Sequence, residues 1–339
     1  MQTNIAISTG PHTHLDHLGV LAVLLNIPLI VTEEKTYQLA KKFYPDLQVF
    51  LKSPEELSLQ FLAQFDRILQ CGQFWAVELV PMIELLHRKR VRILFCPHGN
   101  SDKGHSIKEL PPQDITLVYG DQMALSLQKK GSCSPMIQTG NYRFPYYRKK
   151  QAFYDACAEA AIFKELHPKR KTLLYAPSWN DGENLSSFFS QSGKVIEQLT
   201  KKFNLIVKLH PLLEEHHPAE TEYVLSHYEK SPHLLILQDF PPIYPLLARS
   251  SAYIGDFSSI GYDFLAFDRP LFFLNSSKES LFLQHCGITI SPEENICSVV
   301  ESLWNENQHK FSSMRRKTYQ HAFGQEQEPR QLRNSILSV

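Results

Sequence analysis

Short apolar runs alternate with amphipathic stretches along most of the chain, and this alternation limits the possible folds more than any other feature. It is typical of βαβ units and predicts a parallel sheet with helices packed on it. In the first half it predicts three helices, Leu15–Leu25, Thr36–Lys42 and Phe74–Lys89. It also predicts the strands Ile5–Ser8, Pro28–Thr32, Gln48–Leu51, Arg67–Gln70, Arg92–Cys96 and Ile115–Tyr119.

A second series of the same kind follows a charged, alanine-rich stretch between Tyr146 and Lys164. Its expected strands are Thr172–Ala176, Leu205–Lys208, Leu234–Leu237, Ala252–Ile254 and Pro270–Leu274, and its expected helices are Val195–Lys202, Ile243–Arg249, Ile260–Phe267, Ile296–Trp304 and His309–Phe323. We therefore predict two α/β domains facing a cleft, over residues 1–150 and 151–323, with a polar tail over 324–339 that is either mobile or packed back on the first domain. Ligands should bind at the carboxyl ends of the strands.

The charge balance argues against a nucleic-acid partner. The 339 residues include 35 Lys and Arg against 35 Asp and Glu, so no bulk positive field is available, and any bound anion needs a local site. The six cysteines are scattered with no CxxC pair, which favours reduced thiols and assigns no zinc site to them.

The apolar segments are too short to predict a membrane-spanning helix. The longest, Val20–Val31, is interrupted by Asn26 and Pro28 and falls well short of the roughly 20 residues that span a bilayer. The amino terminus lacks a basic region followed by an apolar one, so no secretory signal is expected. We expect a cytoplasmic chain.

Three strand ends in the second half carry groups suited to an anion. Ser258 and Ser259 follow a strand and open a helix, where backbone N–H groups and the helix dipole favour phosphate. The alternative is that a serine or Asp256 merely caps that helix. Lys208 and His210 end another strand and could hold a diphosphate, and Ser178 lies in a polar loop after a third.

The first half offers a candidate base. His98 follows a strand in a loop of small residues that also carries Lys103, and its ordinary pKa near 6.5 suits removal of a proton from an acceptor hydroxyl. Farther along, Asn141 and Arg143 lie in a tight turn at another predicted strand end.

A competing pattern near the amino terminus matches the HxHxDH ligands of metallo-β-lactamase-type hydrolases. It predicts a dinuclear metal site, and its residues are His12, His14, Asp16 and His17. That fold needs strands before the motif, whereas only one predicted strand precedes it here. The alternative is a polar loop between the first strand and the first helix.

Taken in order, the second-half and His98 motifs resemble the CDP-glycerol glycerophosphotransferase family, which builds teichoic-acid-like chains on a two-domain GT-B scaffold. The loop His98 to Lys103 is similar to the family's HG-x-x-x-K, and Thr139 to Arg143 to its T-G-x-x-R. Tyr175-Ala176-Pro177-Ser178-Trp179, Lys208-Leu209-His210-Pro211, and Asp256-Phe257-Ser258-Ser259 with Asp263-Phe264 follow in the family's order.

The resemblance implies a GT-B fold of two Rossmann-like domains and a transferase acting on a CDP-linked donor and an acceptor hydroxyl. It implies that His98 is the base and that His210 is also catalytic, meeting the charge that grows on CMP as it leaves. It further implies that Lys208, His210, Ser258, Ser259 and Asp256 surround the donor diphosphate, and that transfer proceeds by direct displacement without a metal or another cofactor. Lys103, Asn141, Arg143 and Ser178 are further candidates. Relatives commonly attach to the membrane, so contact with its inner face is also implied, although no helix here is an obvious candidate.

Other functions fit parts of the same pattern. A GT-B glycosyltransferase with a nucleotide-sugar donor would use the same scaffold and phosphate site. A metal-dependent hydrolase would use His12, His14, Asp16 and His17 instead, and an α/β binding module without activity would need neither set. The sequence predicts neither the oligomeric state nor the identity of the acceptor.

Overall fold

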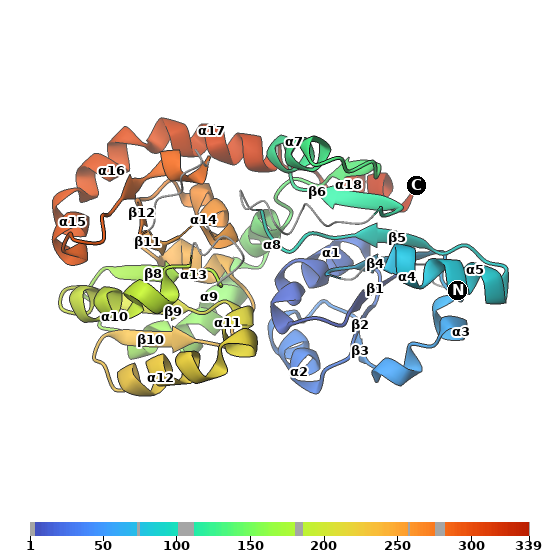
Figure 1. The fold of residues 1–339 in the computed structure, drawn as a ribbon, viewed down its shortest axis with the longest axis horizontal. Coiled ribbons are helices and arrows are strands. Elements are labelled where there is room, and N and C mark those ends of the chain that lie inside the picture. The colour runs from blue at the N-terminus through green and yellow to red at the C-terminus, as the bar shows by residue number, and fades with distance from the viewer. Residues whose placement is uncertain are drawn as a thin grey trace. The chain divides into compact units, whose positions relative to one another are not determined.

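The computed structural model describes residues 4–72, 75–100, 112–179, 186–256, 258–274 and 282–338. They form two compact units (Figure 1). The first unit comprises the described residues up to Asn100, those from 112 to Lys149, and those from His321 onwards. The second takes Lys150–Gln320. The two parallel α/β units confirm the predicted GT-B fold class.

The first unit is built on a parallel sheet of seven described strands in the order β3-β2-β1-β4-β5-β6-β7. Most of these strands are apolar and buried, as expected of strands covered on both faces. The strand order reverses direction between β1 and β4, which is where ligands bind in sheets of this kind. The strands are β1 (Asn4–Ser8), β2 (Leu29–Val31), β3 (Val49–Leu51), β4 (Arg67–Gln70), β5 (Arg92–Phe95), β6 (Ile115–Val118) and β7 (Met136–Gln138).

Helices connect these strands, and two predicted helices are each divided in the structure. Residues 15–25 contain the end of the 3-10 helix η1 (His12–Asp16) and then α1 (Leu18–Leu25), while residues 75–89 contain α4 (Trp75–Glu78) and α5 (Val80–His87). The other helical elements are α2 (Glu34–Phe43), η2 (Pro54–Glu56), α3 (Leu59–Leu62), α7 (Asp121–Lys129) and α8 (Arg143–Lys149).

The carboxyl-terminal segment is not simply a polar tail. It contains the helix α18 (Pro329–Leu337), in which Leu332 and Ile336 are buried. Their spacing of four residues gives the helix one apolar face, and the helix packs on α1 in the first unit.

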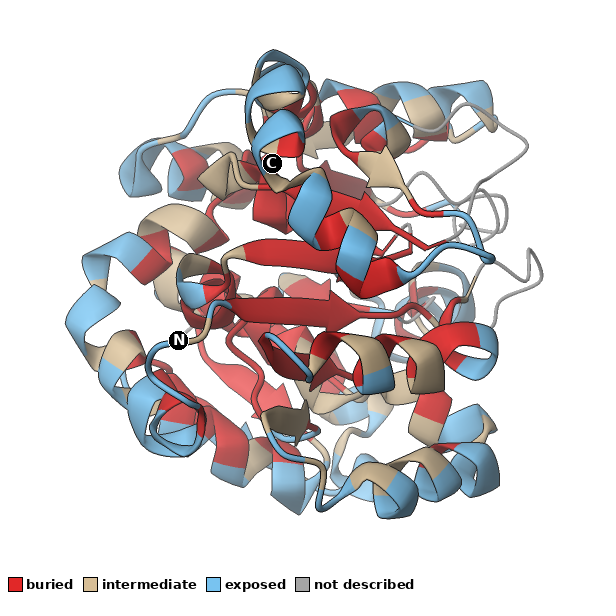
Figure 2. Ribbon diagram, turned by 90° about the vertical axis from the view of Figure 1, so that its left-hand side faces the viewer, coloured by how far each residue is buried: buried red, intermediate tan, exposed pale blue. Residues whose placement is uncertain are grey.

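The second unit repeats the topology of the first. Its parallel sheet has six described strands in the order β10-β9-β8-β11-β12-β13, which is the Rossmann order when the strands are numbered from β8. The strands are β8 (Thr172–Ala176), β9 (Asn204–Lys208), β10 (Leu234–Leu237), β11 (Ala252–Gly255), β12 (Leu271–Phe273) and β13 (Ile288–Thr289). Figure 2 shows buried residues along the strands and exposed residues on the outer sides of the helices.

The core of this unit lies between its sheet and helices such as α10, whose buried residues recur every three to four positions and so form one face. The helical elements are α9 (Gln151–Ala161), η3 (Phe163–Glu165), α10 (Phe188–Leu199), α11 (Pro211–His216), α12 (Pro218–Tyr228), α13 (Tyr244–Arg249), α14 (Ser259–Phe264), η4 (Leu265–Phe267), η5 (Leu283–Cys286), α15 (Ile296–Ser302), α16 (Trp304–Lys310) and α17 (Ser312–Phe323).

Candidate functional site

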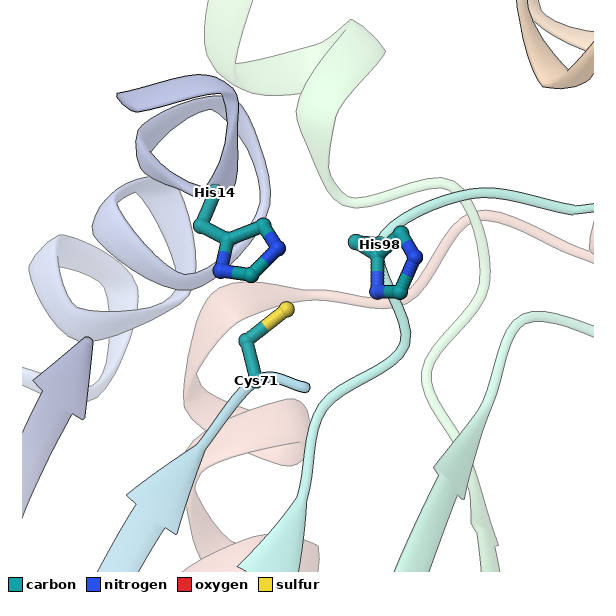
Figure 3. Close-up of side chains that lie close together, drawn as sticks. All are labelled: His14, Cys71 and His98. Atoms are coloured by element: carbon teal, nitrogen blue, oxygen red, sulfur yellow. The ribbon is translucent and has the colours of Figure 1, made fainter. Parts of the chain in front are cut away.

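Three side chains meet at the carboxyl edge of the first sheet. His14 lies in η1 just after β1, Cys71 directly follows β4, and His98 lies three residues after β5. One possible ligand atom from each side chain lies within 4.8 Å of the others (Figure 3). The three residues stand at the point where the strand order reverses. Cys71 was not among the predicted site residues, although its position directly after a predicted strand could have indicated it.

The His14 ring occupies a space that two glycines leave open. A Cβ atom on Gly10 would lie 2.5 Å from Cε1 of His14, and one on Gly72 would lie 3.2 Å from the same atom. The ring is buried, and its Nδ1 has no hydrogen-bond partner in the described part of the chain. Burial and the neighbouring histidines lower the pKa of His14 to about 3. At neutral pH the ring is therefore uncharged.

The predicted base, His98, keeps exposed surface at this edge. Desolvation by the surrounding protein lowers its pKa. The neutral imidazole is therefore the favoured form, and this is the form that can accept a proton. Lys103, predicted as its neighbour, lies outside the described residues.

Asp16 and Arg143 form a buried ion pair. Arg143 Nη1 donates to Asp16 Oδ2 at 2.9 Å, and the Tyr44 hydroxyl donates to Oδ1 at 3.3 Å. The guanidinium also lies over the Tyr119 ring, 5.7 Å from its centroid. The sequence motifs predicted Asp16 as a metal ligand and Arg143 as a cleft residue, and the structure brings them together as partners that connect η1 to α8.

His17 is held by a chain of hydrogen bonds that ends beside His98. The Tyr119 hydroxyl donates to the carbonyl oxygen of Pro97 at 3.0 Å, and its oxygen lies 2.6 Å from Nδ1 of His17. Because the hydroxyl has a single proton, we assign the proton of this second bond to His17 Nδ1. Burial, the Arg143 charge and the neighbouring His98 and His14 hold the pKa of His17 well below its usual range. The chain of bonds fixes the backbone that carries His98.

These contacts change the interpretation of the HxHxDH pattern. Among the described residues, one group of histidine, cysteine or acidic side chains is close enough to share an ion, and it consists of His14, Cys71 and His98. Of the four residues predicted as metal ligands, this group includes His14 alone. Asp16 and His17 instead have partners within the protein, and His12 is not part of the cluster.

Asn141, another predicted candidate, begins a helix. Its Oδ1 accepts a hydrogen bond from the backbone N–H of Phe144 at 3.2 Å, and the residue is buried. The polar side chain of Asn141, which follows β7, therefore helps to start α8, the helix that begins at Arg143.

In the second unit, Asp256 connects the ends of β8 and β11. Its carboxylate accepts hydrogen bonds from the backbone N–H of Ser178, at 2.9 and 3.0 Å to the two oxygens, and from the N–H and hydroxyl of Ser187, at 2.9 and 3.1 Å. Asp256 is fully buried, and Ser178 and Ser187 are also buried. The acid predicted to lie at the donor diphosphate therefore fixes the backbone at Ser178 and at Ser187, and Ser187 was not predicted.

His210 lies at the end of β9 and caps the helix α11. Its Nδ1 accepts from the backbone N–H of Leu212 at 3.2 Å, which places the proton of a neutral ring on Nε2. The ring stacks on Trp179 with centroids 6.4 Å apart, so the loop after β8 lies beside the loop after β9. The side chain of Lys208, the last residue of β9, is buried. His210 can therefore present an N–H donor at the same sheet edge as Lys208.

The predicted serines begin α14. Ser258 is buried at the N-cap and its hydroxyl accepts from the N–H of Ile260 at 3.3 Å, and Ser259 is the first helical residue. The capping alternative is thus fulfilled by Ser258 and not by Asp256. The two serines follow β11, which neighbours β8 in the sheet, so the structure brings them to the edge that also carries Ser178 and Lys208.

The second half of the chain matches a known family. Residues 136–282 match the model of the CDP-glycerol:poly(glycerophosphate) glycerophosphotransferases. The predicted family resemblance is confirmed. The matched residues include the turn at Asn141 and the ends of β8, β9 and β11, and they end before α15.

One curated relative is the teichoic acid glycerol-phosphate primase of Bacillus spizizenii, which is 31% identical over 134 residues. The match covers 38% of this chain and 32% of the primase, so the chain is similar to about a third of that protein.

Solved structures share the fold over nearly the whole chain. Wall teichoic acid polymerase TagF is 14% identical with a TM-score of 0.68, and the match covers 99% of this chain and 89% of that one. The UDP-GlcNAc 2-epimerase of Neisseria meningitidis is 13% identical with a TM-score of 0.59, and the match covers both chains in full. At these identities the likeness supports the two-domain fold alone.

Proposed function

We propose that this protein transfers a glycerophosphate-type group from a CDP-linked donor to an acceptor hydroxyl. The observation that carries the proposal is the glycerophosphotransferase match over residues 136–282, in which the motif residues after Lys150 gather at one edge of the second sheet. The relative named a glycerol-phosphate primase supports a polyol-phosphate donor over a sugar donor. In this proposal the transfer itself needs no metal ion.

His98 is the base in this reaction. The acceptor oxygen attacks the phosphorus that bears the polyol, the bond from that phosphorus to the bridging oxygen of CMP breaks, and CMP leaves. The acceptor proton passes to the imidazole of His98. Its exposed surface and lowered pKa support this role, because a base must be both reachable and unprotonated.

The second unit holds the donor. Lys208 supplies a positive charge, and His210 donates from Nε2 to an oxygen that gains charge as CMP leaves. Ser258 and Ser259 offer hydroxyl and backbone N–H groups at the start of α14. Asp256 would repel a diphosphate and acts instead as a positioning residue, since its carboxylate orders the Ser178 loop.

Titration of the metal-free protein with CDP, UDP, GDP and ADP tests the donor site. We expect selective CDP binding that weakens at least about 10-fold in His210→Ala, because one charge-assisted hydrogen bond contributes roughly 1.5–3 kcal/mol. His227→Ala is the matched control, since His227 is an exposed histidine of α12. Preference for UDP would favour a nucleotide-sugar donor, and absence of nucleotide binding would refute the proposal.

Transfer assays test the base separately. His98→Ala should keep CDP affinity and lose about 100- to 10,000-fold in the rate of transfer, the usual contribution of a general base. An unchanged rate with CDP-glycerol and a polyol-phosphate acceptor would remove His98 from the reaction without affecting the donor site.

We also propose that the chain works in the cytoplasm and contacts the inner face of the membrane through α4 and α5. These helices expose Val77, Met82, Leu85 and Leu86, with fractional exposures of 46%, 48%, 80% and 62%. The basic residues 88–90 follow directly, although Lys89 and Arg90 pair with Asp66 and Asp114. Apolar side chains beside basic ones suit the surface of an anionic bilayer. No helix among the described residues is long and apolar enough to cross a membrane.

Sedimentation with vesicles containing anionic phospholipid tests this contact. The double variant Leu85→Glu/Leu86→Glu should stay in the supernatant while the unchanged protein sediments with the vesicles. Leu125→Glu on α7, which replaces another exposed leucine of the same unit, is the control and should sediment normally. Equal sedimentation of all three proteins would exclude α5 as the contact.

A further inference from the structure

We propose that His14, Cys71 and His98 form a binding site for a zinc-like divalent cation. Sequence reasoning assigned no zinc site to the cysteines and sought metal ligands in the HxHxDH pattern. The structure instead gathers one residue of that pattern with a cysteine and a histidine from two other strand ends. Two imidazoles and a thiol are donors that Zn²⁺ prefers over Mg²⁺ or Ca²⁺, which favour oxygen.

The distances suit a shared ion. Zinc bonds of about 2.0–2.3 Å place tetrahedral ligand atoms about 3.3–3.6 Å apart. The three ligand atoms lie within 4.8 Å of one another, so each pair needs to close by no more than about 1.5 Å. His98 can supply this movement, because its side chain is exposed and follows the end of β5.

The separation of the two rings agrees with the same geometry. Two imidazoles bound to one tetrahedral zinc have ring centroids about 5.2 Å apart, given a Zn–N bond of about 2.05 Å. The His14 and His98 centroids are 5.1 Å apart. Figure 3 shows a ring nitrogen of His14 turned towards His98, with the sulfur of Cys71 close to both rings.

The protein around His14 is shaped for an imidazole that lacks a protein partner. Gly10 and Gly72 leave room for the ring, and Nδ1 of this buried side chain has no hydrogen-bond partner in the described residues. Buried polar nitrogens ordinarily have a hydrogen-bond partner, and leaving such a nitrogen without a partner costs free energy. Packing against the two glycines, and not a hydrogen bond at Nδ1, therefore sets the position of this ring beside Cys71 and His98.

Binding is a simple exchange. Zn²⁺ takes lone pairs from one nitrogen of each histidine and from the sulfur of Cys71, and the thiol proton is released to the buffer. Three protein ligands leave a fourth position for water. A bound ion would also occupy a nitrogen of His98, so we infer that zinc inhibits the transfer. This last inference rests on the proposed function, whereas the site itself does not.

The test is metal binding by the whole, chelator-treated chain, with no nucleotide present. Titration with Zn²⁺ should give one ion per chain at micromolar affinity or better, and Co²⁺ should give the near-ultraviolet absorption of a cobalt–thiolate bond. His14→Ala and Cys71→Ser should weaken binding by about 100-fold or more, since even residues behind the ligands contribute 10- to 100-fold. Cys133→Ser, which removes an exposed free cysteine, is the matched control and should bind normally.

Two outcomes would overturn the site: no stoichiometric binding, or cobalt–thiolate absorption that persists in Cys71→Ser. His98→Ala guards against misfolding of the buried variants, because removal of an exposed side chain leaves the core intact, and it should also weaken zinc binding. Zinc that binds as expected yet leaves transfer unchanged would support the site and count against His98 as the base. Failure of the site would leave the CDP titration unaffected, so the two proposals are tested independently.

Discussion

Removal of either partner of the Arg143–Asp16 pair should strongly destabilise the first unit. The two side chains are 2% and 10% exposed and make contact at 2.9 Å, so either one left alone is a buried charge without its partner. Breaking such a pair costs about 3–5 kcal/mol, and we expect this loss in the free energy of unfolding for both Arg143→Met and Asp16→Asn. The double variant should lose less than the sum, with a coupling energy of about 2 kcal/mol.

The assay is urea unfolding of the first unit followed by fluorescence. Trp75 is the single tryptophan of that unit, so Trp179→Phe/Trp304→Phe provides a background in which fluorescence reports on it alone. Glu56→Gln breaks the partly exposed Lys52–Glu56 pair and serves as the control, for which little change is expected. Single variants as stable as the background protein would refute the reasoning, and additive losses would show that the two side chains act separately.

Three further variants test other parts of the structure. The pKa of His17 is depressed in the folded protein, so below about pH 6.5 the unfolded chain binds more protons, and the free energy of unfolding should fall by up to about 1.4 kcal/mol per pH unit as the pH drops. The urea midpoint should therefore change less between pH 7 and pH 5 in His17→Gln than in the unchanged protein. An equal change of the midpoint in both proteins would contradict this. Gly10→Ala should displace the His14 ring and cost about 1–3 kcal/mol, whereas Gly19→Ala, whose Cβ would meet nothing nearer than 3.5 Å, should be tolerated in the same urea experiment. Asp256→Asn should weaken CDP binding by releasing the backbone at Ser178, and it should lower the free energy of unfolding by about 3 kcal/mol because charge-assisted hydrogen bonds are lost. Unchanged CDP titration and melting curves would contradict the positioning role of Asp256.

The fold could be predicted largely because its central strands are buried on both faces. Strands such as β6 and β8 are buried throughout and apolar except for one threonine each, and such runs are visible in the sequence. The edge strand β13 was missed because it has two half-buried residues. The edge strand β7 was predicted only as a strand end before Asn141, because its three residues are half-buried or exposed. Leu332 and Ile336 of α18 were missed because two apolar residues in a polar segment give little periodic signal.

A site residue could be predicted where its position at the end of one strand identifies it. It could not be predicted where the site depends on contacts between residues far apart in the sequence. His98 follows a predicted strand of the first unit, whereas in the second unit Lys208 ends a predicted strand and Ser258 follows another. Parallel strands bring their carboxyl ends to one edge of each sheet. The partners of Asp16 and His17 lie 127 and 102 residues away in the sequence, so the local pattern suggested metal ligands where the fold supplies protein contacts. Cys71 joins His14 only because β4 pairs with β1, a pairing that skips two strands.

The first unit is assembled from segments at both ends of the chain, and this has a consequence for synthesis. Phe323 packs edge-on against Tyr119 at a centroid distance of 5.7 Å, and α18 covers α1, so residues after His321 complete a core that begins with β1. The segment Lys150–Gln320 is synthesised before residues 321–338, so the first unit stays incomplete until those residues have been added. A nascent chain stalled before His321 would therefore leave apolar surface of α1 exposed to solvent.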